Sequence, residues 1–350
     1  MSKLRTPLSK IDNYPAYLND CWQLHLRERE VNAPTVISTF AGCGGSSLGY
    51  SMAGFRELLA IEWDKNAVET FKLNFADIPV IQDDIAKISV EQIIEMTKLK
   101  QYELDVLDGS PPCQGFSTAG KRIITDERNQ LYKEYVRLLN GLQPKVFVFE
   151  NVSGLVKGKM KLIFADIMRS LKDCGYKVSA RLLNAMYFGV PQSRERLIII
   201  GVREDLGIKP SHPKAIYMPV TVFEGWGGEY IEGPRVTIGE DTETYKWVQK
   251  IGQGMSISEI HPKGYYFNFK RLSFIAPSST LIKNGGKQLI HPIETRTLTT
   301  NEYKRLGSFP DEYKFIGTPE QVTSRIGNSV PPLFMYHIAK HIKDDLLLRQ

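Results

Sequence analysis

The sequence lacks the features that define membrane, secreted and disulfide-rich proteins. None of its apolar runs reaches the roughly 18–20 residues that a membrane-spanning helix needs. The N-terminal stretch contains no apolar core of a secretory signal peptide. The cysteines Cys21, Cys43, Cys113 and Cys174 show no CxxC spacing, which argues against a disulfide scaffold and against a cysteine zinc site. We therefore expect a cytoplasmic protein in a reducing environment, without a metal.

Internal repeats and low-complexity tracts are also absent from the chain. Its 350 residues suffice for one large domain or two of average size, and 42% of them are hydrophobic. The net charge of +6 permits a nucleic-acid partner but does not establish one. The chain should therefore bury a substantial core, and its function has to be inferred from motifs.

Short apolar segments alternate with helical patterns over the first 200 or so residues. The expected strands are 35–40, 58–63, 78–82, 104–108, 145–150 and 196–202, with helical patterns at 64–74 and 129–141. Such alternation indicates a mostly parallel sheet covered by helices on both faces. After about residue 205, glycine, proline and aromatic residues become frequent and the alternation fades. The predicted fold class is therefore α/β, with a second, smaller and irregular domain.

A glycine-rich stretch, "FAGCGG" at residues 40–45, follows the first expected strand. Its glycines allow the backbone to approach a ligand, although the stretch also fits a tight strand-to-helix turn. Glu62 lies 20 residues beyond Gly42, where an acidic side chain commonly binds ribose hydroxyls, and Trp63 could lie against an adenine. Alternatively, Trp63 belongs to the core and Glu62 is a solvated strand end. With Asp84 as an acceptor for an adenine amino group, these residues predict an adenosine-type cofactor, and a nicotinamide enzyme fits equally well.

Three further motifs place reactive side chains at expected strand ends, where open α/β sheets bind ligands. Cys113 follows two prolines in "GSPPCQGFS", a stiff loop that suits a positioned nucleophile, although a core thiol is the alternative. Glu150 ends the apolar run "FVFENV", where a carboxylate is costly unless it is paired or used. Arg194 and Arg196 alternate in "QSRER", so both could point at one site, or else pair with phosphate or surface groups.

Together with "EW", "DI", "RTLTTNEYKRLGSFPDEYKF" and "RIGNSVPP", these motifs resemble in kind and order the motif set of the DNA (cytosine-5) methyltransferase family, of the bacterial and phage modification type. The resemblance covers about residues 35–205 and 293–335, with a variable gap between them, and leaves out residues 1–33. Each motif alone is weak evidence for the family, whereas the complete set in this order is highly specific for it. No catalytic position departs from the family pattern, and Cys43 replaces a commoner small residue in the glycine loop.

The resemblance implies a Rossmann-like, S-adenosylmethionine-dependent methyltransferase domain with a smaller, irregular target-recognition domain. We expect an N-terminal extension at 1–33, the catalytic domain at 34–205 and the target-recognition domain at 206–295. Residues 296–316 would form a hinge motif that packs on the recognition domain, and residues 317–350 would return to the catalytic domain.

The resemblance also implies a cofactor site for S-adenosylmethionine, with S-adenosylhomocysteine as the product and no metal. Its residues would be Phe40, Gly42, Gly44, Gly45, Glu62, Trp63, Asp84, Ile85, Pro112, Leu131, Asn328 and Ser329. By the family pattern, the glycine loop holds the methionine part, Glu62 binds the ribose and Trp63 binds the adenine. Asn328 and Ser329 would bring the end of the chain back beside the glycine loop.

The implied reaction methylates C5 of a cytosine in duplex DNA. Cys113 would add to C6, while Glu150 would engage N3 and the exocyclic amine. Arg194, supported by Arg196, would hold O2 of the base. Because the base cannot react while it is stacked, it must be flipped out of the duplex. The closing loop that contacts the opened duplex would include Ser117, Lys121 and Arg122.

Residues 260–293 contain no aspartate or glutamate, and basic side chains are interleaved with aromatic ones. This pattern suits a surface that faces a DNA groove. The candidate phosphate contacts are Lys263, Lys270, Arg271, Lys283 and Lys287. Alternatively, the aromatic residues form the small domain's core and the lysines its solvated rim, and both interpretations can hold in part. Residues 224–243, by contrast, are strongly acidic and unsuited to phosphates.

The favoured interpretation is a monomeric, sequence-specific DNA cytosine-5 methyltransferase of a restriction–modification system, acting at the nucleoid. A restriction endonuclease for the same DNA site is a candidate partner, and no membrane is involved. An RNA methyltransferase on the same scaffold and a non-catalytic DNA-binding subunit stay open as alternatives. A nicotinamide oxidoreductase would explain the glycine loop but not "PPCQ", "ENV" and "QSRER".

Overall fold

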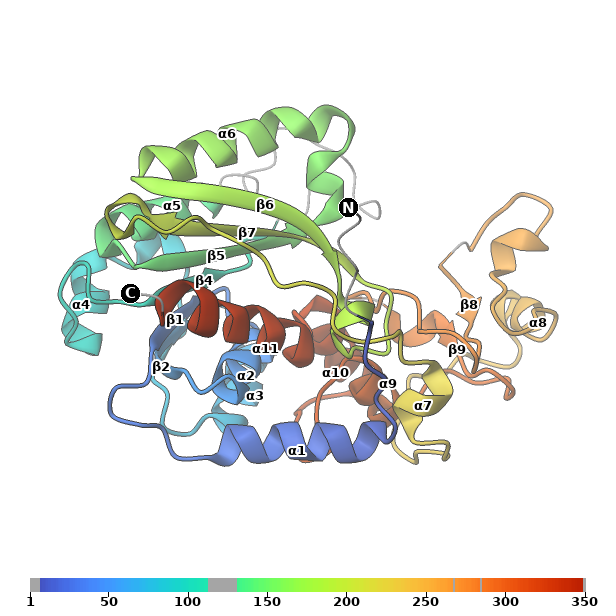
Figure 1. Ribbon diagram of the computed structural model, residues 1–350. Coiled ribbons are helices and arrows are strands. Elements are labelled where there is room, and N and C mark those ends of the chain that lie inside the picture. The colour runs from blue at the N-terminus through green and yellow to red at the C-terminus, as the bar shows by residue number, and fades with distance from the viewer. Residues whose placement is uncertain (1–6, 113–130, 267, 284, 349–350) are drawn as a thin grey trace. The chain divides into compact units, whose positions relative to one another are not determined.

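The computed structural model describes residues 7–112, 131–266, 268–283 and 285–348 (Figure 1). The chain divides into two compact units, each assembled from separate stretches of the sequence. We call them the sheet unit, made of Leu24–Asn184, Glu195–Pro213 and Met335–Gln350, and the loop-rich unit, made of Met1–Gln23, Ala185–Arg194 and Lys214–Phe334. The five domain boundaries expected from the sequence concern functional regions, and they stay a prediction.

A seven-stranded sheet forms the centre of the sheet unit, with the strand order β3-β2-β1-β4-β5-β7-β6. The strands are β1 Thr35–Thr39, β2 Arg56–Ile61, β3 Val80–Ile81, β4 Val106–Gly109, β5 Val146–Val152, β6 Tyr176–Asn184 and β7 Glu195–Arg203. Strands β1 to β5 run parallel, whereas β7 pairs antiparallel with both β5 and β6. This arrangement confirms the predicted α/β class and its mostly parallel sheet.

Helices cover both faces of this sheet. They are α2 Gly45–Met52, α3 Lys65–Asn74, α4 Val90–Thr97, α5 Leu131–Leu142 and α6 Lys161–Asp173. In Figure 1, α2 and α3 lie on the opposite side of the sheet from α6. The first turns of α3 and α4 are capped by side chains, because Asp64 accepts from the N–H of Ala67 and Ser89 from that of Gln92. Helices α3 and α4 thus begin where the sequence supplies a capping residue, whereas α2 and α6 begin without a side-chain cap.

Strand β6 was not predicted from the sequence. It is an edge strand, and its side chains are mostly half-buried or exposed, with Lys177 and Arg181 among them. Charged residues of this kind protect an edge strand from pairing with other chains, but they also weaken the apolar signal of a strand. The central strands β4 and β5, which are buried on both faces, gave a clear signal for the opposite reason.

The register of the sheet aligns the carboxyl ends of its central strands. Thr39 on β1 lies opposite both Ile61 on β2 and Gly109 on β4. Gly109 in turn lies opposite Phe149 on β5. The residues that directly follow this row are Phe40, Glu62, Ser110 and Glu150. Neighbouring strands lie only about 4.8 Å apart, so the register gathers several predicted site residues at one edge.

The loop-rich unit contains short elements joined by long connections. Its elements are α7 Val222–Trp226, α8 Glu243–Val248, β8 Lys270–Arg271, β9 Leu289–Ile290, α9 Thr300–Leu306 and α10 Pro319–Asn328. Strands β8 and β9 form a two-stranded parallel sheet. Val248, Ile251, Ile257 and Ile290 form a small core, against which Tyr266 and Phe269 also pack. The irregular texture expected after residue 205 is therefore confirmed.

Two helices contain a boundary between the units, namely α1 Tyr14–Leu26 and α11 Pro332–His341. Helix α11 continues into a π-helical turn, Ile342–Leu347. Residues 1–33 were expected only as an N-terminal extension, without an element of their own, and α1 lies within them. Its buried side chains Tyr14, Leu18 and Cys21 recur every three or four residues, a short stripe that polar neighbours obscure. Within the described ranges, no helix is long and apolar enough to cross a membrane.

Two buried carboxyl groups lie between the sheet and α2. Ser47 of α2 donates to Glu57 Oε1 at 3.0 Å, and the Tyr50 hydroxyl donates to Asp108 Oδ1 at 3.3 Å. Burial raises the pKa of Glu57 to about 7. Burial, together with repulsion by Glu57, raises the pKa of Asp108 to about 8. Both groups therefore bind protons more tightly in the folded state than in the unfolded chain.

This difference predicts that Asp108→Asn flattens the pH dependence of stability. In the wild type, the unfolded state ionises near pH 4 while the folded state keeps its proton, so stability is lost as pH rises from about 4 to about 8. The amide does not titrate. The free energy of unfolding of the variant should therefore fall by up to ~1.4 kcal/mol less per pH unit than that of the wild type in this window. Urea unfolding at pH 5, 6, 7 and 8 measures this, and parallel pH profiles would contradict it.

Candidate active site and recognition region

The glycine loop after β1 has a backbone that few residue types adopt. Phe40, Gly42 and Gly44 have positive φ angles of 55°, 58° and 92°, and Gly45 begins α2. Positive φ is strained for a phenylalanine, and such strain often occurs at ligand-binding sites. The space beside Gly42 is open, since no atom lies within 4 Å of where a Cβ would be. The loop therefore offers bare backbone at the carboxyl edge of the sheet.

The carboxylate of Glu62 is buried and holds this loop together. Its Oε2 accepts from the N–H of Gly42 at 2.8 Å, and its Oε1 accepts from those of Trp63 and Asp64 at 2.9 and 2.8 Å. Burial raises the pKa of Glu62, and the backbone N–H groups oppose that rise. The carboxylate is thus fixed in orientation by the backbone of two adjacent strand ends.

Trp63, the next residue, is 76% exposed. The structure therefore reverses the alternative interpretation, in which Trp63 was core and Glu62 was solvated. An exposed indole beside an ordered carboxylate offers a flat apolar surface, which suits a planar ligand group. Asp84 is exposed and caps a short 3₁₀ helix by accepting from the N–H of Ala86, while Ile85 beside it is buried.

The loop that should carry the nucleophile is described only up to Pro112. Asn151, which follows Glu150, donates from Nδ2 to the carbonyl oxygen of Pro111 at 3.1 Å. This bond ties the beginning of the loop to the end of β5. Leu131 begins α5 at the other end of the gap and is half-buried. The predicted site residues Cys113, Ser117, Lys121 and Arg122 lie outside the described residues.

Glu150 and Arg196 form a buried ion pair between β5 and β7. Arg196 Nε lies 3.0 Å from Glu150 Oε1, and their side chains are only 13% and 9% exposed. The pair forms because the antiparallel register sets Val152 opposite Arg196, close to Glu150 on β5. Burial lowers the pKa of Arg196, and the charge of Glu150 counteracts that shift. A carboxylate held in this way at a strand end can orient and stabilise a polar substrate group.

The first half of the "QSRER" motif lies in the loop-rich unit and makes different contacts. The buried Gln192 accepts from the N–H of Leu281 at 2.9 Å and donates to the carbonyl oxygen of Leu306 at 3.2 Å. The buried Arg194 donates to the carbonyl oxygens of Leu281, Gly327 and Ser329 at 2.8, 3.2 and 2.9 Å. Gln192 and Arg194 therefore join three segments that are remote in sequence.

The two arginines that the sequence assigned to one site thus have separate surroundings. Arg196 contacts a carboxylate in the sheet unit, whereas Arg194 contacts backbone oxygens in the loop-rich unit. Asn328 ends α10, and Ser329 follows as its C-cap, with its hydroxyl donating to the carbonyl oxygen of Arg325 at 2.7 Å. The proposed cofactor role of Asn328 and Ser329 stays a prediction.

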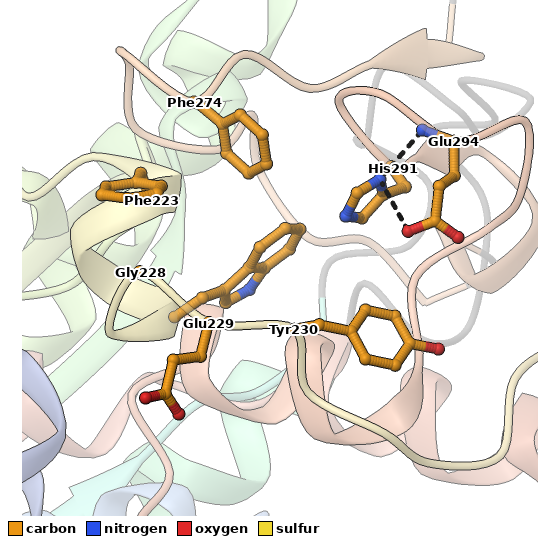
Figure 2. Close-up of a pocket in the computed structure, with 8 residues that line it drawn as sticks. Phe223, Gly228, Glu229, Tyr230, Phe274, His291 and Glu294 are labelled. Atoms are coloured by element: carbon orange, nitrogen blue, oxygen red, sulfur yellow. Dashed lines mark hydrogen bonds and ion pairs between the residues drawn. The ribbon is translucent and has the colours of Figure 1, made fainter.

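Figure 2 shows a pocket of about 130 Å³ within the predicted recognition region, with Phe223, Phe274 and Tyr230 on its walls. Trp226 stacks on His291, with ring centroids 5.4 Å apart and an interplanar angle of 8°.

His291 Nδ1 accepts from the N–H groups of Ile293 and Glu294, and burial lowers the pKa of the ring. The ring is therefore neutral, and the approach of Glu294 to Nδ1 at 3.7 Å is not an ion pair. The aromatic walls of the pocket, together with the carboxylates of Glu229 and Glu294, suit a planar or cationic group rather than a phosphate.

The basic residues of the acid-free stretch differ in their exposure. Lys263, Lys283 and Lys287 are exposed, and Lys270 is half-buried. Arg271 is only 5% exposed. Each nitrogen of its guanidinium donates to backbone carbonyl oxygens, among them those of Val248, Ile251 and His291. The expected phosphate contact by Arg271 is therefore withdrawn, because its donors already bind the protein's own backbone.

The aromatic residues of the same stretch support both interpretations in part. Tyr266 and Phe269 pack against the small core, as the structural alternative predicted. Tyr265 is 57% exposed and stacks on His261, with ring centroids 5.3 Å apart. Tyr265 is therefore available to a partner, whereas Tyr266 and Phe269 contribute to the fold.

Sequence reasoning missed several residues that build these sites. Asn151 was quoted within a motif but given no role, and Gln192 was passed over in favour of the neighbouring arginines. The bidentate pair of Arg296 with the fully buried Glu302, at 2.8 and 2.9 Å, was also missed. A signal for the last was present, because Thr299 and Glu302 have the spacing of a capping box.

Comparison with known proteins identifies the family. Residues 34–344 match the family described as C-5 cytosine-specific DNA methylase. The Type II methyltransferase M.NgoFVII of Neisseria gonorrhoeae is 34% identical over 338 residues, covering 89% of this chain and 87% of that protein. The Type II methyltransferase M.PspPI of Psychrobacter sp. is 34% identical over 363 residues, covering 96% of this chain and 85% of that protein.

A solved structure shares both fold and sequence with the chain. It is described as a candidate DNA modification methyltransferase encoded within a prophage of E. coli, with a TM-score of 0.74 and 28% identity. The alignment covers 91% of this chain and all of that one. The chain therefore belongs to the C-5 cytosine-specific DNA methylase family, and it is a DNA (cytosine-5-)-methyltransferase. The predicted family, fold class and enzyme class are confirmed.

The contacts of Arg271 predict that replacing it destabilises the loop-rich unit and removes no contact to a DNA phosphate. Arg271→Met should lower the free energy of unfolding by about 2–4 kcal/mol, because several buried carbonyl groups lose a charged donor. Urea unfolding measures the loss. The matched variant Lys263→Met changes an exposed lysine and should unfold like the wild type. Equal stability of the Arg271 variant would contradict its structural role.

Proposed function

We propose that the enzyme transfers a methyl group from S-adenosylmethionine to C5 of a flipped-out cytosine within a specific sequence of duplex DNA. The observation that carries this proposal is the common edge of the sheet. There, the glycine loop and Glu62 follow the same residue row as Glu150, which pairs with Arg196. A cofactor site and a group that engages the base would thus stand on one rigid sheet.

We also propose that the enzyme is the modification partner in a restriction–modification system, acting as a monomer on DNA at the nucleoid in the cytoplasm. The Type II names of M.NgoFVII and M.PspPI support this role. A restriction endonuclease that cuts the same sequence would be its functional counterpart.

The residues of the glycine loop fit S-adenosylmethionine. The open space beside Gly42 leaves room for the methionine part, and the exposed Trp63 suits the adenine. The oriented carboxylate of Glu62 suits ribose hydroxyls. The other proposed contacts are Phe40, Gly44, Gly45, Asp84, Ile85, Pro112, Leu131, Asn328 and Ser329. When bound, the cofactor supplies an electrophilic methyl group on a sulfonium sulfur.

The chain's own residues prepare the cytosine for this methyl group. The thiolate of Cys113 forms a bond to C6, which breaks the aromaticity of the ring and makes C5 nucleophilic. Glu150, carrying a proton in the complex, donates a hydrogen bond to N3 and accepts one from the exocyclic amine, which stabilises the negative charge that develops on the ring. Once C5 is methylated, a base removes the C5 proton, the electron pair re-forms the double bond, and the Cys113 thiolate leaves.

The contacts support a division of roles between the two arginines. Because Arg196 pairs with Glu150, we assign it the contact to O2 of the base. Arg194 binds three backbone oxygens of two segments, at Leu281 and at Gly327 and Ser329, and we assign it a positioning role. This assignment reverses the order expected from the sequence. Ser117, Lys121 and Arg122 keep their proposed place in a loop that closes on the flipped base, whose extrusion costs a few kcal/mol.

Glu62→Gln should weaken the binding of S-adenosylhomocysteine by about 10- to 100-fold. The amide removes the charge and turns an NH₂ group toward a backbone N–H donor, at a cost of about 1.5–3 kcal/mol. Calorimetric titration measures the affinity. Binding to non-specific duplex DNA serves as the control and should not change. Unaltered affinity for the cofactor product would rule out this site.

Duplex DNA with 5-fluorocytosine at the target should trap the enzyme covalently, and only in the presence of S-adenosylmethionine. Fluorine at C5 cannot leave as a cation, so the bond between C6 and the Cys113 sulfur persists after methyl transfer. The target is first found by bisulfite sequencing of DNA from cells that express the protein, and transfer RNA is tested in parallel as the alternative substrate. Denaturing electrophoresis detects the adduct.

Mass spectrometry should place the adduct on the peptide that contains Cys113. Cys21, Cys43 and Cys174 are internal controls, because all three are buried. Burial raises the pKa of Cys21 to about 12 and also raises that of Cys174. Cys113→Ser should form no adduct while still binding DNA. An adduct on another cysteine, or none at a verified target, would refute the proposed mechanism.

A further inference from the structure

A second pocket in the loop-rich unit is lined by basic side chains. Its volume is about 390 Å³, and it lies between α10 and the segment that contains Lys283 and Lys287. Arg325 of α10 is a third cation in its lining, and Glu320 is the one carboxylate. Three positive charges and one negative charge leave the pocket with a net charge of +2. The pocket is therefore suited to an anion.

The two sides of this pocket are joined by close backbone packing. A Cβ on Gly327 of α10 would lie 2.4 Å from the backbone of Ile282. A Cβ on Gly286 would lie 2.5 Å from Thr323 Oγ1. Position 327 thus needs glycine, because a side chain there would meet the backbone of the segment that carries the lysines, and a side chain at position 286 would displace the side chain of Thr323.

Arg194 reinforces this junction with charged hydrogen bonds. It donates to the carbonyl oxygen of Leu281 on one side and to those of Gly327 and Ser329 on the other. Hydrogen bonds from a charged donor are stronger than those between neutral groups. The cations of the pocket are therefore held on a preformed frame, which reduces the entropy lost when a ligand binds.

The lysines themselves are available to a ligand. Lys283 and Lys287 are exposed, and no residue that the structure describes pairs with either of them. Arg325 is half-buried on α10. Lysine and arginine side chains that converge on one pocket are the usual means of binding a phosphate group. In addition, Lys283 and Lys287 belong to the acid-free stretch 260–293, along which a polyanion meets no repulsion.

We propose that this pocket is a binding site for a backbone phosphate of the DNA substrate, formed by Lys283, Lys287 and Arg325. The inference rests on the proposed function and adds Arg325 to the candidate DNA contacts, from a segment expected to return to the catalytic domain. It also explains the positioning role of Arg194, because Arg194 holds the two sides of the phosphate site together. Glu320 at the pocket weakens the attraction for phosphate.

The test uses fluorescence anisotropy with a labelled non-specific duplex, since binding to phosphates does not depend on sequence. The variants are Lys283→Gln/Lys287→Gln, Arg325→Gln and Glu320→Gln, and affinity is measured at several salt concentrations. We expect the double variant and the Arg325 variant to bind about tenfold or more weakly at low salt. The slope of log affinity against log salt concentration should fall by about 0.9 for each phosphate that the variant no longer neutralises.

Glu320→Gln should act in the opposite direction and bind DNA severalfold more tightly. The matched control is Lys172→Gln/Lys177→Gln, which removes the same charge from two exposed lysines of the sheet unit and should keep the wild-type slope. Titration with S-adenosylhomocysteine verifies that each variant is folded. If the slope changes as much in the control as in the Lys283/Lys287 variant, the effect comes from net charge alone. That result would overturn the proposal.

Two further outcomes separate the alternatives. If the pocket variants lose affinity for inorganic phosphate but keep the wild-type slope with DNA, the site binds a small free anion and the proposal is wrong. Methyl incorporation by the wild type is measured in the same preparation. If the pocket variants keep the wild-type slope while the wild type methylates DNA, the proposed phosphate site is wrong and the proposed function is unaffected. A wild type that transfers no methyl group to DNA would overturn the function itself.

Discussion

The parallel alignment of five strands is the constraint on which the rest of the structure depends. Parallel strands end at the same edge, and here Thr39, Ile61, Gly109 and Phe149 share one row. Every loop that leaves this row begins within one strand spacing of the next, about 4.8 Å. The chain can therefore bring together groups separated by more than a hundred residues without any long-range contact beyond the sheet itself.

Two carboxylates at this edge are buried, and each is stabilised in its own way. Glu62 accepts from three backbone N–H groups, so its orientation depends on the local fold and not on any other side chain. Glu150 is paired with Arg196, so its charge depends on a strand that arrives from the opposite direction. A buried carboxylate without such partners is costly. The fold thus keeps two acidic groups oriented at the carboxyl edge of the sheet.

The sequence predicted those parts of the structure that depend on local pattern. Buried strands such as β4 and β5 are short apolar runs, and their ends carry Glu150 and the beginning of the proline loop. The pairing of Glu150 with Arg196 was not predictable, because it depends on the antiparallel register between two strands far apart in sequence. The prediction that Arg271 contacts a phosphate was wrong for a related reason. A cation among lysines in an acid-free stretch looks exposed, and only the fold reveals the carbonyl oxygens around it.

The "QSRER" motif contributes residues to both compact units. Gln192 and Arg194 bind backbone N–H and C=O groups of the loop-rich unit, at Leu281, Leu306, Gly327 and Ser329. Backbone groups are present whatever the side chain, so these bonds survive changes of sequence in the segments that they join. Two residues further along the chain, Arg196 contacts Glu150. The bonds of Gln192 and Arg194 to these backbone groups can therefore persist while the side chains of the joined segments change, so the loop-rich unit can keep its frame when its surface differs.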